Sequence, residues 1–401
     1  MSKEKILLLP AINIKSGVSR SFYFAKELSH YYEVYVTEWE DPQSVEFDNS
    51  LKGNKFHTLK CFVKSLFSRT KISQHPTHNY NIVKSPKMTL LVIHKLLGVV
   101  LALRLIRFYN TIVLNRLIKR INPTILFYAD GCDMYPINRS VKMIITDIQD
   151  DFSKGNFRDN KYQQKYGEKN LNLSDKNYIV SKSAKSRLSE FYNTQFEYIP
   201  NGADFESLRD IKENDTKLLR EQLGLNEKLI VSFIGGGLWL DTPFSKKLFS
   251  ETLNECPQVH FVLIGNHKQI KNTENVTNLG RMSNAETYKY YNLSDVGIFL
   301  KNSKGSPFLE NSVPLKIIQY SSVNKYVITP YISWLEEEKF NNIVLLKDFN
   351  TTTIIAAFKN ILANNNELIF DEKWNSYNWK EIVLRITNFI TLKSEEIAND
   401  K

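Results

Sequence analysis

Short strand-like segments alternate with helix-like segments along almost the whole chain of 401 residues. In the first half the strand-like segments are 5–10, 32–38, 124–129, 142–147, 177–181 and 196–200, and in the second half they are 228–236, 259–265, 275–280, 295–300, 325–330 and 342–346. Strands that alternate with helices are typical of parallel βαβ units. The sequence therefore predicts an α/β protein built from two successive sets of such units.

The composition supports two domains with cores of their own. Of the residues, 42% are hydrophobic and 24% are charged, and a chain of this length normally divides into two domains. We expect the polar stretch 204–227 to connect them. The three cysteines Cys61, Cys132 and Cys256 fit no metal-binding spacing, which indicates free thiols in a reducing cytoplasm. The first residues, MSKEKILLLPAIN, carry charge and then a short apolar run, which predicts a first strand rather than a signal peptide.

Positive charge is concentrated in the segment 52–120. The chain has a net charge of +10, and the residues between Asp48 and Asp130 include fourteen Lys and Arg but no Asp or Glu. Such a segment suggests a docking face for an anionic partner: a nucleic acid, an acidic membrane surface or a phosphorylated acceptor. An ordinary solvated basic face is the alternative, although such a face normally carries some acidic residues as well.

The stretch 88–121 within this segment is apolar but interrupted by His94, Lys95, Arg104 and Arg107. Its cleanest apolar run is shorter than the roughly 20 residues that a membrane span needs. Two interpretations stay open: a buried helix with a basic exposed end, or an amphipathic helix lying in a membrane interface. Residues 55–73 show the same mixture of Phe, Leu and Lys, which favours an anionic membrane over a nucleic acid, and no nucleic-acid-binding module is recognisable.

Open α/β sheets bind ligands beyond the carboxyl ends of their strands, and two glycine-containing segments occur at such places. The segment NIKSGVSRSFYF places Gly17 at a turn and Ser19 and Arg20 at a helix start, where free N–H groups can face a phosphate or a sugar. The segment FIGGGLWLD places Gly235, Gly236 and Gly237 after a strand, where a ligand can approach the backbone closely. A tight turn explains the three glycines equally well.

A third segment, VPLKIIQYSSVNKYVITP, begins with a loop that delivers Lys316 to the start of a helix. The helix dipole disfavours a cation there, so a bound phosphate would explain the lysine better. Gln319 and Tyr320 follow one turn later, and Gln319 is placed to hydrogen-bond the hydroxyls of a ribose. The alternative is an amphipathic helix with Lys316 and Gln319 on its surface.

A fourth segment, IITDIQDDFSKGNF, has Asp147, Asp150 and Asp151 at the end of an apolar strand. Clustered carboxylates raise one another's pKa and can leave one of them as a general base. A site for a divalent metal and a simple helix N-cap are the alternatives.

Together these segments resemble the GT-B glycosyltransferases. YIPNGADF (198–205) is similar to the signature that closes their N-terminal domain, and NVTNLGRMSNAETYKYYNLSDVGIFL (275–300) is similar to their nucleotide-binding segment. VPLKIIQYSSVNKYVITP (313–330) resembles the element whose lysine meets the donor diphosphate, and SYNWKEIVLRITNFI (376–390) resembles the closing helices. FIGGGLWLD and TDIQDDFS resemble a bacterial group that includes teichuronic-acid and capsule enzymes and the xanthan β-glucuronosyltransferase.

The resemblance implies a fold of two Rossmann-like domains that face a cleft. Residues 1–203 would form the N-terminal acceptor-binding domain, with the basic segment 52–120 facing a membrane. Residues 204–375 would form the domain that binds the nucleotide-sugar, and 376–401 a C-terminal helix that returns to the N-terminal domain.

The resemblance also implies a role for each matching residue. Asp150 or Asp151 would be the base that deprotonates the acceptor hydroxyl, and Lys316 would neutralise the leaving nucleoside diphosphate. The remaining donor-site positions are Gly236 and Gly237 against the phosphates or the sugar, the backbone near Arg281 and Met282 around the base, Gln319 on the ribose and Tyr320 beside it. Gly17, Ser19 and Arg20 would face the acceptor or a phosphate. No metal and no cofactor is expected, because the lysine and helix dipoles stabilise the leaving group.

One departure from the family pattern bears on stereochemistry. Retaining members often carry two Glu in the lysine-containing element, whereas here Asn311 and Gln319 occupy those positions, with Glu310 beside the first. This difference favours inversion by direct displacement, with an Asp as the base.

The acceptors of this bacterial group are often lipid-linked saccharides, so the resemblance implies an enzyme of surface polysaccharide synthesis. We expect a UDP-linked sugar as donor, a saccharide acceptor that carries a lipid diphosphate, and peripheral binding to the cytoplasmic face of the cell membrane. Two alternatives stay open: a catalytically silent subunit that binds nucleotide-sugars, and a nucleotide-sugar epimerase of the same architecture.

Overall fold

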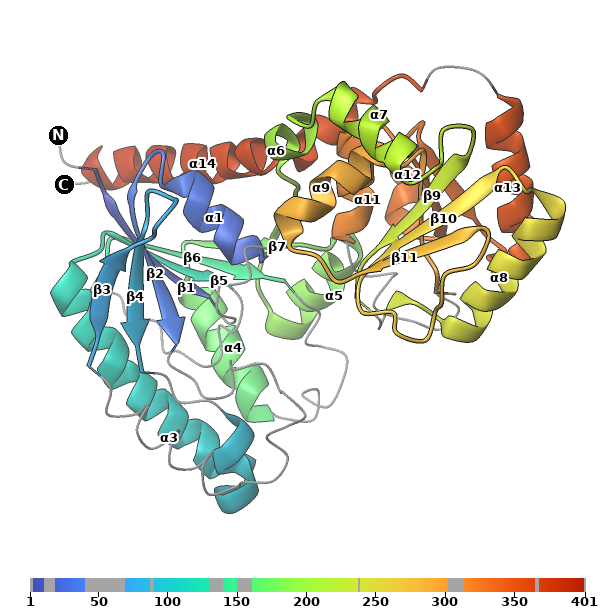
Figure 1. Cartoon of the computed structure of the whole chain (residues 1–401). Helices are drawn as coiled ribbons and strands as arrows, with labels where there is room; N and C mark the ends of the chain where they lie inside the picture. The colour runs from blue at the N-terminus through green and yellow to red at the C-terminus, as the bar shows by residue number, and fades with distance from the viewer. Residues whose placement is uncertain are drawn as a thin grey trace. The chain divides into compact units, whose positions relative to one another are not determined.

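The computed structural model describes residues 3–10, 19–39, 69–86, 90–129, 140–149, 161–236, 239–301, 314–364 and 368–399. The chain forms two compact units (Figure 1), one of residues 1–200 with 383–401 and the other of residues 201–382. Each unit has its own sheet, so the predicted α/β fold of two Rossmann-like domains is confirmed.

The first unit contains an eight-stranded sheet in its described part, with the order β3-β4-β2-β1-β5-β6-β7-β8. Its strands are β1 (Lys5–Pro10), β2 (Glu33–Trp39), β3 (Lys71–Gln74), β4 (Asn81–Ser85), β5 (Ile125–Ala129), β6 (Met143–Ile148), β7 (Lys176–Ile179) and β8 (Glu197–Tyr198). All neighbours are parallel except β3, which runs antiparallel to β4 at the edge. Strands β5 and β6 are buried along their whole length, as central parallel strands covered on both faces are.

The strands β3 and β4 lie inside the basic segment and were not among the predicted strands. Their sequences, KISQ and NIVKS, are short and polar, and every residue of β3 is exposed. Charged residues on a short edge strand protect it from pairing with other chains. The same charges remove the apolar pattern from which a strand is predicted.

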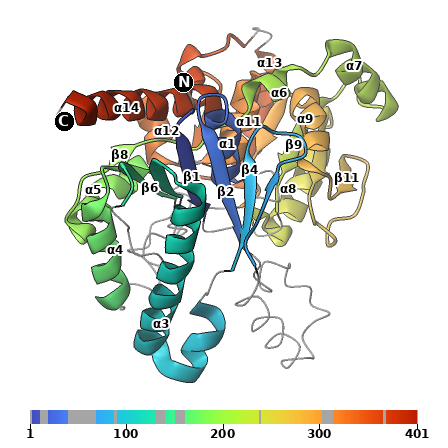
Figure 2. The same cartoon turned by 90° about the vertical axis from the view of Figure 1, so that its left-hand side faces the viewer.

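The helices of the first unit are α1 (Arg20–Leu28), α3 (Leu90–Ile121), α4 (Lys161–Leu173), α5 (Lys182–Tyr192) and most of α14 (Trp379–Asn399). Helix α3 lies against the sheet, and its N-terminal half extends beyond the ends of the strands (Figure 2). Val113, Leu114 and Leu117 of its C-terminal half are buried in a core with residues of β1, β4, β5 and β6.

The middle of α3 has a different character. Val100, Leu101, Leu105 and Phe108 are exposed, Phe108 to 68%. The structure therefore shows a buried C-terminal half and an exposed apolar stretch before it, and the membrane-interface interpretation of that stretch stays a prediction. Within the described residues, none of the helices combines the length and the apolar character that a membrane span requires.

The second unit contains a six-stranded parallel sheet with the order β11-β10-β9-β12-β13-β14. Its strands are β9 (Leu229–Ile234), β10 (Val259–Ile264), β11 (Val276–Gly280), β12 (Val296–Ile298), β13 (Tyr326–Pro330) and β14 (Ile343–Leu346). Counted along the chain this is the order 3-2-1-4-5-6 of a Rossmann sheet. The direction of strand addition reverses between β9 and β12, and the carboxyl ends of these two strands are therefore the expected ligand position.

The helices of the second unit are α6 (Phe205–Arg209), α7 (Glu213–Gln222), α8 (Thr242–Glu255), α9 (Asn284–Leu293), α11 (Leu315–Ser322), α12 (Ser333–Glu338), α13 (Thr351–Ala363) and the 3-10 helix η4 (Glu372–Tyr377). The polar stretch 204–227 was expected to connect the domains and also to begin the second domain, and the structure assigns it to the second unit. This stretch forms α6 and α7 of the second unit, and Phe205 and Leu208 are buried in its core. The apolar positions of so short a helix are too few for a helical pattern to stand out in the sequence.

The chain crosses between the units twice. The two crossing segments contact each other within each unit. In the second unit Ala203 pairs with Asn378, and Gly202 has no room for a side chain, because a Cβ atom would lie 2.9 Å from the carbonyl oxygen of Tyr377. In the first unit the side chain of Arg385 donates a hydrogen bond to the carbonyl of Tyr198. The glycine of the predicted signature thus allows two chain segments to approach each other closely.

Candidate functional site

Lys316 lies where the Rossmann sheet predicts a ligand. It is the second residue of α11, whose N-cap is Pro314 and whose first turn contains no acidic residue. The side chain is 9% exposed, and its Nζ atom makes no hydrogen bond with any described atom. The nearest groups are aromatic: Nζ lies 4.1 Å from the ring centroid of Phe233, at the end of β9, and 4.9 Å from that of Phe299, after β12. The lysine therefore occupies the switch point itself.

The environment of Lys316 disfavours its charge. Burial lowers the pKa of the amine to about 7, and no carboxylate among the described residues acts against this shift. Aromatic faces attract a cation only modestly, and the positive end of the α11 dipole repels it. A bound anion would supply the missing counter-charge, and strongly shifted pKa values of this kind concentrate at functional sites.

Glycines make room for the lysine. A Cβ atom on Gly235 would lie 3.1 Å from Lys316 Nζ, so a side chain at Gly235 would crowd the amine. No described atom lies within 4 Å of the corresponding position on Gly236, which leaves its backbone open to a ligand. Gly237 lies outside the described residues.

Gln319 faces a hydrogen-bond donor of the protein. Its Oε1 atom accepts a hydrogen bond from the hydroxyl of Tyr291 on α9, at 2.7 Å. Because this contact occupies the oxygen, the Nε2 group is the end of the amide that remains as a donor for a ligand hydroxyl.

Tyr320 is part of the core. It has no exposed surface, and its hydroxyl lies 2.7 Å from Ser232 Oγ and donates to the carbonyl of Ser232 at 3.0 Å. Its ring occupies the space beside Gly297, where a Cβ atom would lie 2.3 Å from the ring. Tyr320 therefore fixes α11 on β9 and β12 and so places Lys316, whereas it offers no surface to a ligand.

Arg281 and Met282 follow β11, at the same carboxyl edge of the sheet. Gly280 turns the chain with a φ of 73°, a left-handed conformation that suits glycine. Arg281 is exposed, and Met282 is partly buried against the core. Strand β11 is separated from the switch point by β10, so these two residues lie at the outer edge of the sheet.

The first unit places Arg20 in its interior, which corrects the prediction that this residue faces a phosphate. The guanidinium forms two hydrogen bonds of 2.8 Å with the carboxylate of Asp147 and also donates to the carbonyls of Ile199 and Pro200. The side chains of this pair are almost fully buried. Ser19 caps α1, because its Oγ accepts a hydrogen bond from the backbone N–H of Phe22 at 3.2 Å.

Of the three predicted carboxylates, the structure describes Asp147 alone. Asp147 is committed to Arg20, while Asp150 and Asp151, like Gly17, lie outside the described residues. Within the part of the chain that the structure describes, no group of three His, Cys, Asp or Glu side chains is arranged to hold a metal ion.

Three residues of this site were not predicted. Phe233 and Phe299 belong to apolar runs that predict strands, and both lie at the carboxyl ends of the strands that flank the switch point. His267 follows β10, and its buried ring lies 5.4 Å from that of Phe233. The signal for His267 was its place two residues after Gly265 at the end of an apolar strand.

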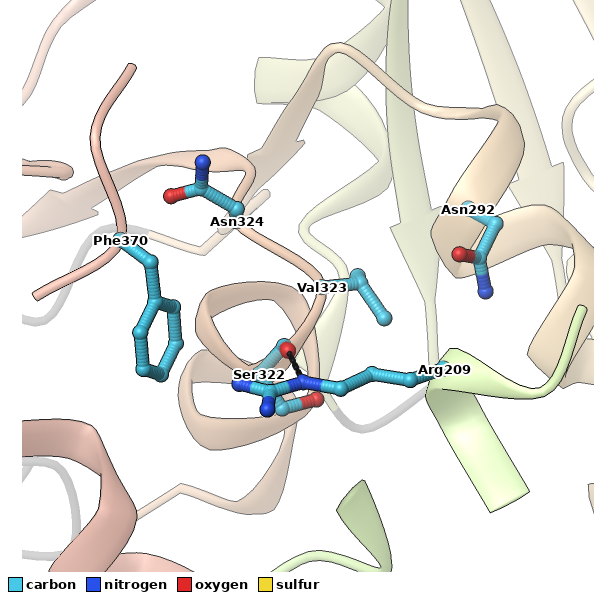
Figure 3. Close-up of a pocket in the computed structure, with 6 residues that line it drawn as sticks. All are labelled: Arg209, Asn292, Ser322, Val323, Asn324 and Phe370. Atoms are coloured by element: carbon cyan, nitrogen blue, oxygen red, sulfur yellow. Dashed lines mark hydrogen bonds between the residues drawn. The ribbon is translucent and has the colours of Figure 1, made fainter. Parts of the chain in front are cut away.

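A cavity of about 370 Å³ lies at the other end of α11 and has a structural explanation (Figure 3). Arg209 points across it and donates from Nε to the carbonyl of Ser322 at 2.8 Å, and its guanidinium lies 4.5 Å from the ring centroid of Phe370. A cation at a helix C-terminus is favourable. This arginine thus caps α11.

A second cavity, of about 440 Å³, lies in the first unit between α3 and the edge strands. It is lined by Arg69, Thr70, Pro86, Val113, Arg116, Leu117 and Arg120. Arg120 donates to the carbonyl of Thr70 at 2.7 Å, whereas Arg69 and Arg116 form no ion pair with any residue that the structure describes. The lining of the cavity therefore combines apolar side chains with three arginines.

Comparison with solved structures shows what this architecture is. The chain is similar to sucrose-phosphate synthase from Thermosynechococcus elongatus, with a TM-score of 0.64, 12% identity and 97% and 99% of the two chains covered. It is also similar to the Anabaena protein HepE in complex with UDP, with a TM-score of 0.62, 11% identity and coverage of 97% and 99%. A third similar structure is a UDP-forming α,α-trehalose-phosphate synthase from Burkholderia vietnamiensis, with a TM-score of 0.62, 12% identity and coverage of 99% and 100%.

The chain has a GT-B fold. The likeness extends over both units at identities that establish the fold alone. No protein-family model and no curated protein sequence matches the chain. In the GT-B arrangement of this chain, Lys316 belongs to the second of the two Rossmann-like units.

The Arg20–Asp147 pair gives a prediction about stability. Removing one partner of a buried ion pair leaves an uncompensated charge, so Arg20→Met and Asp147→Asn should each lower the free energy of unfolding of the first unit by about 3–5 kcal/mol. The double variant should lose less than the sum, because neither charge is then left alone. Urea unfolding followed by tryptophan fluorescence and circular dichroism measures all three variants. An Arg20→Met variant as stable as the wild type would restore the interpretation of Arg20 as a ligand-facing residue.

Proposed function

We propose that the protein is a glycosyltransferase that moves a sugar from a UDP-linked donor to a saccharide acceptor. The observation that carries the proposal is the buried amine of Lys316, without a counter-charge among the described residues, at the switch point of the second sheet. A nucleoside diphosphate supplies the charge that this amine lacks. The similarity to a structure solved with UDP and to a UDP-forming synthase supports UDP as the nucleotide.

In this proposal the donor is held by residues of the second unit. Lys316 neutralises the diphosphate, the open backbone of Gly236 and Gly237 lies against the phosphates or the sugar, and the Nε2 group of Gln319 donates to the ribose. The backbone at Arg281 and Met282 frames the base. Metal-independent catalysis is part of the proposal, because the ammonium group and the N-terminus of α11 stabilise the charge that develops on the leaving group.

The transfer step is an inverting displacement. The acceptor oxygen attacks the anomeric carbon as the bond from that carbon to the diphosphate oxygen breaks, and the electron pair of that bond leaves with UDP. The carboxylate of Asp150 or Asp151 takes the proton of the acceptor hydroxyl. Asn311 and Gln319, where retaining enzymes often carry Glu, support inversion.

The acceptor is proposed to be a lipid-diphosphate-linked saccharide at the inner face of a bacterial membrane, in surface polysaccharide synthesis. The exposed side chains of Leu101, Leu105 and Phe108 share one side of α3, because their spacing matches one and two turns of a helix. The arginine-lined cavity beside the same helix offers positive charge. An apolar stripe next to cationic groups suits an interface of anionic headgroups and acyl chains.

The first prediction of the proposed function concerns donor binding. Lys316→Ala should weaken UDP binding by about 1–3 kcal/mol, the range for a charge-assisted contact. Lys325→Ala is the matched control, because burial also lowers the pKa of Lys325 but this residue lies before β13, at the opposite edge of the sheet. Isothermal titration calorimetry with UDP measures both variants. Equal UDP affinity of Lys316→Ala and the wild type would remove the basis of the proposal.

The second prediction concerns catalysis. Asp150→Asn or Asp151→Asn should reduce turnover by about 10²–10⁴-fold, the contribution of a general base, and leave UDP affinity unchanged. Turnover is measured as free UDP together with a new glycosidic bond. Full activity of both variants would reject an Asp base. A binding-only subunit would release no UDP from any donor, and an epimerase would change the sugar without forming a glycosidic bond.

The third prediction concerns the membrane. Co-sedimentation with anionic vesicles should decrease as salt rises, because screening weakens attraction between charged surfaces. Leu105→Ser with Phe108→Ser should reduce binding at every salt concentration, whereas Leu392→Ser should not, although Leu392 of α14 is 62% exposed in the same unit. Equal binding to neutral and anionic vesicles would contradict the proposed attraction.

A further inference from the structure

His267 is held firmly by its backbone. Its N–H donates to the carbonyl of Gly265 at 3.1 Å, and its own carbonyl accepts from the side chain of Asn278 at 3.0 Å and from the N–H of Ile270 at 2.9 Å. The residue is 5% exposed. These hydrogen bonds thus fix the turn that contains His267 at the carboxyl end of β10.

The imidazole of His267, in contrast, has no hydrogen bond. Both Nδ1 and Nε2 are buried and make none with any atom of the described residues. The carbonyls of Ile264 and Gly235 lie beside the ring and favour its protonated form, but neither meets the geometry of a hydrogen bond. Gly265, with a φ of 145°, allows the imidazole to lie close to the backbone, because a Cβ atom at this position would lie 2.5 Å from His267 Nε2.

His267 and Lys316 converge on one aromatic ring. The amine lies 4.1 Å and the imidazole 5.4 Å from Phe233, and the charge of Lys316 is one of the causes that lower the pKa of His267. No carboxylate among the described residues shifts the pKa of either group. Two basic side chains, one from the turn after β10 and one from α11, therefore lie against the same ring, and no described carboxylate balances their charge.

A second histidine, which lies on β10 itself, shows what a purely structural arrangement looks like here. His260 is also buried on β10, and its Nε2 lies 2.8 Å from the hydroxyl of Thr277 on β11. Burial lowers the pKa of both histidines. Buried polar groups are normally hydrogen-bonded, so the unpartnered ring of His267 calls for a ligand in a way that His260 does not.

We propose that His267 is a second diphosphate-binding residue, which donates a ring N–H to a phosphate oxygen of the nucleotide beside the ammonium group of Lys316. The proposal rests on the proposed function, since the diphosphate is that of the nucleotide-sugar donor. A neutral imidazole already provides one N–H donor, and a protonated imidazole adds charge. The strand order brings both residues to the switch point, where β9 lies between β10 and β12.

The proposal implies that UDP binding depends on pH. Without nucleotide, burial holds the pKa of Lys316 at about 7 and that of His267 below its ordinary value. A bound diphosphate favours both protonated forms and so raises both pKa values. UDP affinity gained from these groups is therefore greatest at low pH and is lost as the pH rises through the pKa values of the bound state.

The test compares His267→Phe with His260→Phe by calorimetric titration with UDP and UMP at pH 6, 7 and 8. His267→Phe keeps a ring against Phe233 but removes both nitrogens, and it should weaken UDP binding about tenfold, as the loss of one charge-assisted hydrogen bond does. UMP, which lacks the second phosphate, should lose less. The increase in UDP affinity from pH 8 to pH 6 should be smaller than in the wild type, and the ionisation of UDP itself cancels in this comparison. His260→Phe should behave as the wild type.

Unchanged UDP affinity and unchanged pH dependence of a folded His267→Phe variant would overturn the proposal. If this variant does not fold, His267→Gln provides the same test. The glutamine keeps an N–H donor without a titrating group, so UDP binding should persist with a reduced pH dependence, and a pH dependence equal to the wild type would overturn the proposal. A wild-type protein that binds no UDP at any pH contradicts the proposed function as a whole, which is a different result from a loss confined to His267.

Discussion

The amine of Lys316 is buried in the second unit, where no described atom balances its charge. The surrounding residues position the amine and leave space for it. Tyr320 fixes α11 through Ser232, Gly297 leaves space for the tyrosine ring, and Gly235 leaves space for the amine. The two ends of α11 differ in their charge. Arg209 stabilises the C-terminus of the helix, where a cation is favourable, whereas Lys316 stands at the N-terminus, where it is not.

Among the described residues, Arg20 and Lys316 are both buried basic side chains, but their surroundings differ. Arg20 has a carboxylate and two carbonyls as partners, and its charge is fully used inside the first unit. Among the described residues, the neighbours of the Lys316 amine are the rings of Phe233 and Phe299, and the imidazole of His267 makes no hydrogen bond. Unsatisfied buried polar groups are costly, and proteins keep them where a ligand completes the arrangement. On this physical basis we propose that the second unit binds the diphosphate, at the carboxyl edge of its sheet.

The sequence predicted the sheets well, because a buried parallel strand is an uninterrupted apolar run, as in β5, β6 and β10. It failed for the edge strand β3 and its neighbour β4, because polar and charged residues interrupt the apolar pattern of these short strands. Lys316 was found because a cation at a helix start conflicts with the dipole, a conflict that is visible locally. The place of Arg20 was not predictable in this way, because its partner Asp147 is 127 positions away and only the sheet topology brings the two together. His267 was missed for the same reason, since its unpartnered ring becomes apparent only when β9 and α11 are placed around it.

The most direct measurement is a crystal structure of the protein with bound UDP. If the buried amine exists to meet a diphosphate, Lys316 Nζ should lie within hydrogen-bond distance, about 2.7–3.2 Å, of a phosphate oxygen. A UDP molecule bound elsewhere, with Lys316 Nζ still enclosed by Phe233 and Phe299 and in contact with no phosphate, would contradict the central claim.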